Sequence, residues 1–134
     1  MRFLLDTIMC VSLIRRQSAA ILSRLTRLPI EVVGVSSITV AELQYGVQKS
    51  GRPQENQQAL DQFLIPLAIL PFDYDASIVY GRIRVYLEAQ GTPIGSLDTL
   101  IAAHAVSQGL TLVTSNMGEF ERVPDLYVED WSRV

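Results

Sequence analysis

The chain has 134 residues, of which 49% are hydrophobic and 19% charged, so it suits one compact domain with a real core and excludes intrinsic disorder. Its net charge of −3 weighs against nucleic-acid binding through a general excess of basic residues. One histidine and one cysteine are too few for a typical zinc site or for acid and base work shared by two imidazoles, so a hydrolase of this composition would rely on carboxylates and a hard cation.

The apolar runs of the chain are short, which excludes a membrane-spanning helix. The run at 110–113 is far below the roughly 20 residues that cross a bilayer. Asp6 lies where a signal peptide would have its apolar core. Cys10 is the single cysteine and cannot form an internal disulfide, which agrees with a reducing compartment. We therefore expect a cytoplasmic protein without membrane association.

Short apolar runs alternate with stretches of helical periodicity along the chain. In chain order they predict a strand at 2–5, helix at 8–28, strand at 31–35, helices at 39–48 and 54–65, strand at 68–70, helices at 75–90 and 97–108, strand at 110–114 and a short strand at 126–128. Gly91 and Gly109 are expected to end the helices before them. The pattern predicts an α/β fold, in which one domain over 1–134 has a mainly parallel central sheet of four to five strands flanked by helices.

Acidic residues follow several of these strands. Asp6 follows the first strand, and Glu42 lies in the first turn of the helix after the second. Asp98 lies in the first turn of the helix at 97–108, and Glu119 follows the fourth strand. Ligands of open parallel sheets bind beyond the carboxyl ends of the strands, and clustered carboxylates need a cation to ionise together. The pattern suggests a site for Mg²⁺, whose bound water becomes a nucleophile.

The same acids also have purely structural interpretations. Thr39 and Glu42 have the spacing of a capping box, in which Glu42 would only bind the Thr39 amide. Asp98, after Ser96 as the cap, would favour the positive end of its helix without any metal. Asp6 is also compatible with a turn, although an acid that ends a buried strand fits that interpretation less well, and Glu119 is compatible with a solvated charge in a loop. Spacing alone leaves both interpretations open.

Four stretches of the sequence carry a resemblance to a known family. They are residues 3–7 (FLLDT), 36–46 (SSITVAELQYG), 93–105 (PIGSLDTLIAAHA) and 111–123 (TLVTSNMGEFERV). In this order they resemble the motifs of the PIN-domain ribonucleases and, among these, of the VapC-type toxins of toxin–antitoxin pairs. The resemblance covers nearly the whole chain, and its third stretch is the most specific.

The resemblance implies a PIN-like domain with the activity of an endoribonuclease that depends on Mg²⁺ or Mn²⁺. It places the catalytic and metal-binding acids at Asp6, Glu42, Asp98 and Glu119. It also places three polar residues beside these acids, namely Thr7, Thr114 and Asn116. The expected substrate is single-stranded or loop RNA, with tRNA as one candidate.

The sequence departs from the family pattern at two places. Ile8 stands where the family usually has Asn, which removes a polar group beside the metal-binding Asp6 and is expected to lower activity. Ser115 replaces a common Asn, and many PIN domains carry Asp at the position of Asn116, so Glu119 is the better fourth acid. The alternative function is therefore a catalytically impaired PIN domain that only binds RNA or an antitoxin.

An aspartyl phosphatase is a further alternative that the sequence disfavours. Such an enzyme typically needs an Asp two residues after the first, where this chain has Ile8, and a lysine, of which Lys49 is the only example.

The resemblance further implies a homodimer and a separate antitoxin whose cationic tail crosses the acidic groove. Arg15 and Arg16 are candidate RNA contacts within a basic group that includes Arg24 and Arg27, although a solvated helix face is the simpler explanation of this group. His104, among apolar helix residues, is expected to be structural, and Cys10 to be a small core residue.

Overall fold

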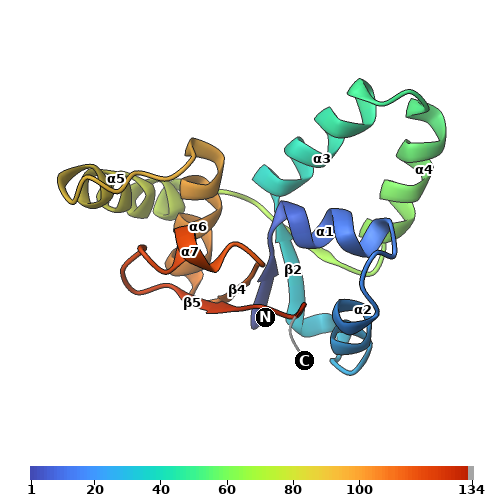
Figure 1. Ribbon diagram of the computed structural model, residues 1–134, viewed down its shortest axis with the longest axis horizontal. Coiled ribbons are helices and arrows are strands. Elements are labelled where there is room, and N and C mark those ends of the chain that lie inside the picture. Colours follow the sequence, from blue (N-terminus) through green and yellow to red (C-terminus); the bar gives the residue numbers. More distant parts are fainter. Residues whose placement is uncertain (133–134) are drawn as a thin grey trace.

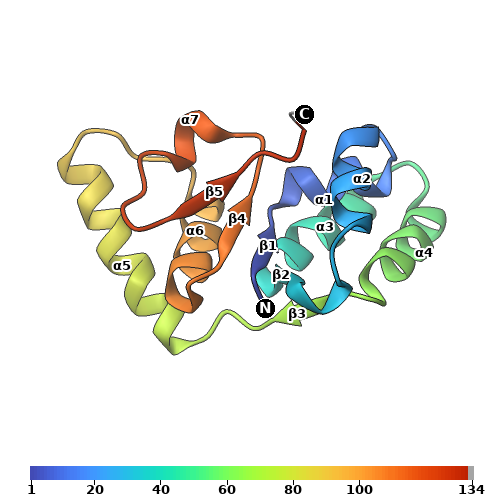
Figure 2. The same ribbon diagram turned by 90° about the horizontal axis from the view of Figure 1, so that it is seen from below.

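The computed structural model describes residues 1–132, and a parallel sheet runs through its centre (Figure 2). The strand order is β3-β2-β1-β4-β5, and all neighbouring strands are parallel. The strands are β1 (Phe3–Leu5), β2 (Val33–Ser36), β3 (Ala68–Leu70), β4 (Thr111–Val113) and β5 (Tyr127–Glu129). With β1 in the middle, the carboxyl ends of β2, β1 and β4 lie side by side. The predicted α/β fold with a parallel sheet is confirmed.

Alternate side chains of β1 enter two separate hydrophobic cores, as the period of a strand requires. Phe3 and Leu5 pack into a cluster with α1 to α4, whereas Leu4 packs on the other face with α5 and α6 (Figures 1 and 2). The helices are α1 (Thr7–Ile14), α2 (Ala19–Thr26), α3 (Ser37–Lys49), α4 (Pro53–Leu64), α5 (Tyr74–Ala89), α6 (Ser96–Gln108) and α7 (Met117–Phe120). Within residues 1–132, no helix has the length and apolarity needed to cross a membrane.

The helix predicted over 8–28 is wrong in its middle, because the chain forms two helices there. Arg16 adopts a positive φ of 53°, and Ser18 then caps α2 by accepting a hydrogen bond from the Ile21 amide at 3.2 Å. A serine side chain favours such a cap over the interior of a helix.

The remaining elements begin and end within two residues of their predicted positions, with two additions. A short 3₁₀ helix (Ile30–Val32) precedes β2, and α7 (Met117–Phe120), which carries Glu119, was not predicted. Gly91 and Gly109 have positive φ angles of 71° and 65°, so both helix ends predicted at glycine are confirmed.

Candidate active site

Asp6 lies directly after β1, at the carboxyl edge of the sheet, and is only 3% exposed. It is the N-cap of α1, since its Oδ1 accepts a hydrogen bond from the Met9 amide at 2.8 Å. Burial raises the pKa of the Asp6 carboxyl, while hydrogen bonds from Thr114 and Met9 lower it. The charge of Glu42 raises it further, so Asp6 combines a structural role with a place near other acids.

Glu42 lies in the second turn of α3, and the prediction that it lies in the first turn is wrong. The capping-box interpretation also fails, because Ser36 is the N-cap and accepts a hydrogen bond from the Ile38 amide at 3.1 Å. Glu42 Oε1 instead accepts a hydrogen bond from the Thr7 hydroxyl at 2.8 Å. This bond joins α3 to the first residue of α1 and holds Glu42 near Asp6.

Asp98 lies in the first turn of α6, whose N-cap is Gly95, so a cap by Ser96 is not formed. Burial is the largest cause that raises the pKa of Asp98, followed by a hydrogen bond with Glu119 and the charge of that residue. The charges of Asp6 and Glu42 raise this pKa further, to about 7 from the usual 3.8. Asp98 thus lies within electrostatic reach of the other three predicted acids.

The N-cap residue of α7, Asn116, holds Glu119 in place. Glu119 Oε2 accepts a hydrogen bond from the Asn116 side-chain amide at 2.8 Å. The Asn116 backbone amide in turn donates to Thr114 Oγ1 at 2.9 Å. Thr7, Thr114 and Asn116 therefore each contact one of the acids, as the resemblance implied.

Asp130 belongs to the same edge of the sheet and was missed in the sequence. It follows β5 directly, and its charge also raises the pKa of Asp6. The signal was available, because an acid after the last strand of a parallel sheet obeys the same rule as Asp6 after the first.

The predicted RNA contacts lie at the other end of α1. Arg15 lines a cleft of about 190 Å³ between α1, α3 and α4 that also contains Thr7 and Glu42. Arg16 is exposed just beyond it. Arg24, which the sequence placed in the same basic group, pairs with Glu129 at 2.9 Å and is tied to β5. Of the four arginines in this predicted basic group, Arg15 is therefore the one that lines the cleft containing Glu42.

The donors fit a hard cation by their chemistry, since all four are carboxylates. Within residues 1–132, however, no group of three or more acidic, histidine or cysteine side chains is arranged to hold one metal ion. Mg²⁺ commonly takes only one or two carboxylates and keeps several waters, which is compatible with this arrangement. One turn before Glu42, the buried Thr39 hydroxyl has no hydrogen-bond partner among the described residues, which is rare for a buried polar group.

His104 and Cys10 lie outside this group of acids. His104 is fully buried, with its Nδ1 2.7 Å from Ser36 Oγ, which agrees with the structural role predicted for it. Cys10 is fully buried in the core as predicted, and burial raises the pKa of its thiol well above the usual value.

Known proteins resemble the chain over nearly its full length. The PIN-domain family profile matches residues 3–126. Ribonuclease VapC2 of Rickettsia felis is 42% identical over 134 residues, covering 99% of this chain and 100% of the relative. The tRNA(fMet)-specific endonuclease VapC of Salmonella typhimurium is 41% identical over 131 residues, covering 98% of each chain.

Two crystal structures show the same fold. One is VapBC2 from Rickettsia felis bound to a DNA fragment from its promoter, with a TM-score of 0.89, 41% identity, and coverage of 98% of this chain and 99% of that one. The other is DNA-bound VapBC from Salmonella typhimurium, with a TM-score of 0.93, 41% identity and coverage of 98% of both. The chain therefore belongs to the PIN-domain family, among the VapC ribonucleases of toxin–antitoxin pairs.

Proposed function

We propose that the chain is an endoribonuclease toxin that hydrolyses RNA phosphodiesters with Mg²⁺ or Mn²⁺ and is neutralised by a cognate antitoxin protein. The observation that carries this proposal is the gathering of carboxylates around Asp98, which is hydrogen-bonded to Glu119 and close to Asp6 and Glu42 at the carboxyl edge of the sheet. Burial and this crowding raise the pKa of Asp98 to about 7. Like charges in such proximity are unfavourable until a cation neutralises them. A site of this kind needs no imidazole for hydrolysis, which suits a chain whose one histidine lies elsewhere.

The four acids would hold the cation together with bound waters, because no three of them within residues 1–132 are arranged to hold one ion directly. When bound, it would acidify a water molecule and screen the charge of the attacked phosphate. The chain's own residues fix the carboxylates, because Thr7 binds Glu42 at 2.8 Å and Asn116 binds Glu119 at the same distance. With these side chains fixed, one carboxylate is available to orient the attacking water in line with the phosphodiester.

The substrate class that we propose is tRNA, in the cytoplasm. This rests on the relatives, one of which is named a tRNA(fMet)-specific endonuclease. Arg15 and Arg16 supply the positive charge for RNA phosphates, since Arg15 lines the cleft that contains Glu42 and Arg16 is exposed beside it. This local charge offsets the acidic balance of the chain.

The cleft between α1, α3 and α4 is our candidate site for the antitoxin. The related structures are VapBC complexes, each of a toxin with its own antitoxin. Apolar side chains dominate its lining: Val11, Ile14, Leu43, Val47, Ala59 and Leu60. An antitoxin segment that places apolar side chains there and a cationic group at Glu42 would block the acids.

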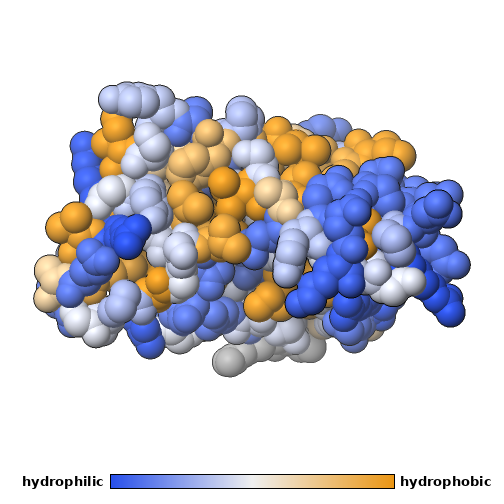
Figure 3. All heavy atoms as spheres, turned by 90° about the horizontal axis from the view of Figure 1, so that it is seen from above, coloured by the Kyte–Doolittle hydropathy of each residue, from blue (hydrophilic) through white to orange (hydrophobic). Residues whose placement is uncertain are grey.

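We further propose that the toxin is a homodimer. Val85 and Tyr86 on α5 are 67% and 44% exposed, and Leu97 at the start of α6 is 46% exposed. Seen from above in Figure 3, apolar side chains lie over the middle of the molecule and on its left, where α5 lies in Figure 1. Contact with a second copy of the chain would remove these side chains from water. Light scattering of the antitoxin-free toxin measures whether this dimer forms.

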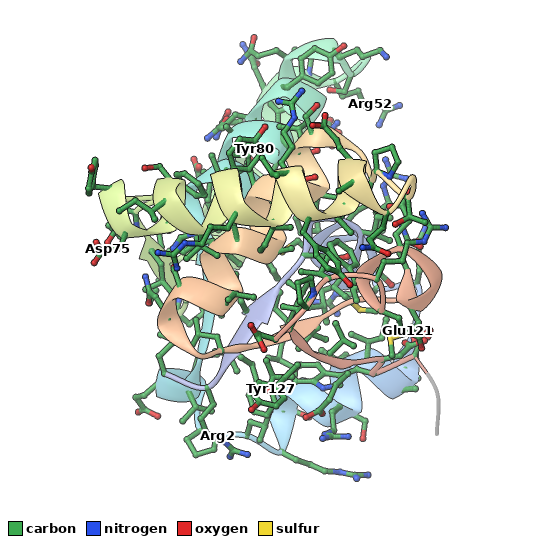
Figure 4. The ribbon with its side chains drawn as sticks, turned by 90° about the vertical axis from the view of Figure 1, so that its left-hand side faces the viewer. Arg2, Arg52, Asp75, Tyr80, Glu121 and Tyr127 are labelled. Carbon is green, nitrogen blue, oxygen red and sulfur yellow. The ribbon has the colours of Figure 1, made fainter. Side chains whose placement is uncertain are left out.

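The decisive experiment is cleavage of total tRNA by the antitoxin-free protein. We expect discrete cleavage with Mg²⁺ or Mn²⁺ that disappears with EDTA, with Asp98→Asn and with Glu119→Gln. Glu121→Gln is the matched control, because Glu121 is an exposed acid two residues from Glu119 at the outer edge of the molecule (Figure 4). Cleavage that persists in EDTA or in Asp98→Asn would contradict the metal mechanism.

The alternative is a catalytically impaired domain, and Ile8 is the observation that favours it. Ile8 is 57% exposed in the first turn of α1, two residues after Asp6, and contributes no polar group. A folded protein that binds antitoxin but cleaves no tRNA in either metal would support this alternative.

A further inference from the structure

A buried polar junction joins the segment that leads into α3 to the middle of α6. We define it by Ser36, Ser37, Phe72 and His104. His104 Nδ1 lies 2.7 Å from Ser36 Oγ, and the His104 ring meets the Phe72 ring edge-on with centroids 5.6 Å apart. The Phe72 amide donates to Ser37 Oγ at 3.0 Å, so three segments of the chain meet at this point.

Both ring nitrogens of His104 have partners. The arrangement with the proton on Nδ1 satisfies both, because Nδ1–H then donates to Ser36 Oγ and Nε2 accepts from the Gln108 side-chain amide at 3.3 Å. His104 and Ser36 are both fully buried. A buried imidazole is costly to desolvate unless its hydrogen bonds are made, so a hydrocarbon side chain would be the simpler choice if only packing were needed.

The junction connects the two helices that carry Glu42 and Asp98. Ser36 is the N-cap of α3 and holds the first turn by accepting a hydrogen bond from the Ile38 amide at 3.1 Å. Glu42 follows Ser36 by six residues on α3, and Asp98 precedes His104 by six residues on α6. Six residues of helix span about 9 Å. Because a helix of this length is stiff, fixing Ser36 and His104 also fixes the positions of Glu42 and Asp98.

We propose, resting on the metal-dependent ribonuclease function above, that His104 is a positioning residue. By binding Ser36, it fixes the start of α3 against α6 and thereby the separation of the Glu42 and Asp98 carboxylates. Thr7 fixes Glu42 from the other side at 2.8 Å, so α3 is held against both α1 and α6. His104 does not touch the substrate or the cation in this role.

Two substitutions of similar size separate the hydrogen bond from the packing. His104→Leu and His104→Asn remove the same ring and the same contact with Phe72, but only Asn keeps a polar atom that can reach Ser36. Gln108→Leu is the control, because it removes the partner of Nε2 and leaves the Ser36 bond intact. The measurements are the Mn²⁺ dissociation constant of the antitoxin-free protein by calorimetry, and kcat and KM for tRNA.

We expect His104→Leu to weaken Mn²⁺ binding by roughly tenfold, as loss of the groups that orient metal ligands commonly does. It should lower kcat with little change in KM, whereas His104→Asn and Gln108→Leu stay close to the wild type. Equal loss in the Leu and Asn variants, or no loss in either, would overturn the positioning role.

A second readout separates this proposal from the proposed function. If the wild type binds no Mn²⁺, the metal proposal fails. Amide exchange at Ile38 then tests whether His104 fixes the start of α3 through Ser36. Faster exchange at Ile38 in His104→Leu than in His104→Asn supports it, because the Ile38 amide donates to the same Ser36 hydroxyl. Equal exchange in the two variants contradicts it.

Discussion

Ile8 is the residue at which this chain departs most from its family, and it allows a direct test. Its side chain is 57% exposed in the first turn of α1, two residues after Asp6. We expect Ile8→Asn to tighten Mn²⁺ binding and to raise tRNA cleavage by up to about tenfold, because a polar side chain there can orient Asp6 or a bound water. Stability should change little, since an exposed apolar side chain is replaced by a polar one.

The control for Ile8→Asn is Leu22→Asn on α2, where another exposed apolar residue of a helix, 42% exposed, lies away from the four acids. Calorimetric Mn²⁺ titration of both variants separates a local effect from a general one. Equal Mn²⁺ affinity in Ile8→Asn and the wild type would show that this position does not affect the cation.

Cys10 provides a prediction about the core beneath the site. Burial raises the pKa of its thiol, with a further contribution from the charge of Asp6, and the side chain is 0% exposed. Because the thiolate is the reactive form, we expect no labelling by a thiol reagent in the folded protein, even at mildly alkaline pH, and one label per chain in urea. Stoichiometric labelling without denaturant would contradict the packing of α1 on β1.

The acids themselves could be predicted from the sequence, but their partners could not. Asp6 and Asp98 stand out because each lies at the carboxyl edge of a predicted strand or at the start of a helix. The bond from Thr7 to Glu42 joins residues 35 positions apart, and no local pattern encodes such a pair. The bond from Asn116 to Glu119 is local, yet it depends on α7, a helix of four residues that is too short to show periodicity.

At the scale of elements, apolar periodicity located the helices but not the break between α1 and α2. Leu13 and Ile21 pack into the same core, so the apolar pattern continues through the loop that separates them. Leu22, the apolar neighbour of Ile21, is nevertheless 42% exposed. The break depends on the Ser18 cap and on the positive φ of Arg16. The local conformational preferences of these two residues are too weak to predict it from the sequence.

The contact between α2 and β5 is the element-scale interaction that we would test. Arg24 pairs with Glu129 at 2.9 Å and lies over the Trp131 ring at 5.6 Å, and Trp131 packs edge-on against Phe3. We expect Arg24→Ala to lower the free energy of unfolding by about 1 kcal/mol, because a partly exposed ion pair and a cation–π contact are both weak. Urea denaturation measures this difference.

Arg27→Ala is the matched control for Arg24→Ala, since Arg27 is exposed at the end of the same helix and forms no ion pair within residues 1–132. High salt should reduce the difference between the two variants by screening the ion pair. Identical midpoints for both variants at low salt would show that Arg24 does not hold α2 to β5.

At the scale of the whole molecule, two groups make stability depend on pH in opposite directions. The pKa of Asp98 is raised to about 7, so its contribution is fully present below its unfolded pKa of 3.8 and is lost as pH rises through about 7. Burial lowers the pKa of His104, so its contribution is present above its unfolded pKa of 6.5 and is lost as pH falls below that value. The loss from Asp98 therefore runs from its unfolded pKa of 3.8 to its folded pKa of about 7, and below pH 6.5 it opposes the gain from His104.

We therefore expect the Asp98 carboxyl to lower the stability of the metal-free toxin as pH rises from 3.8 to about 7, because over this range it is charged in the unfolded chain but still neutral in the folded one. Mn²⁺ should restore stability, and by more at the higher pH, because the charged carboxylates bind it best. Asp98→Asn should flatten the pH dependence in EDTA, since it removes the group that titrates there. Urea midpoints across this pH range measure all three effects. If the midpoint of Asp98→Asn changes with pH as steeply as that of the wild type, the titrating charge lies elsewhere in the molecule.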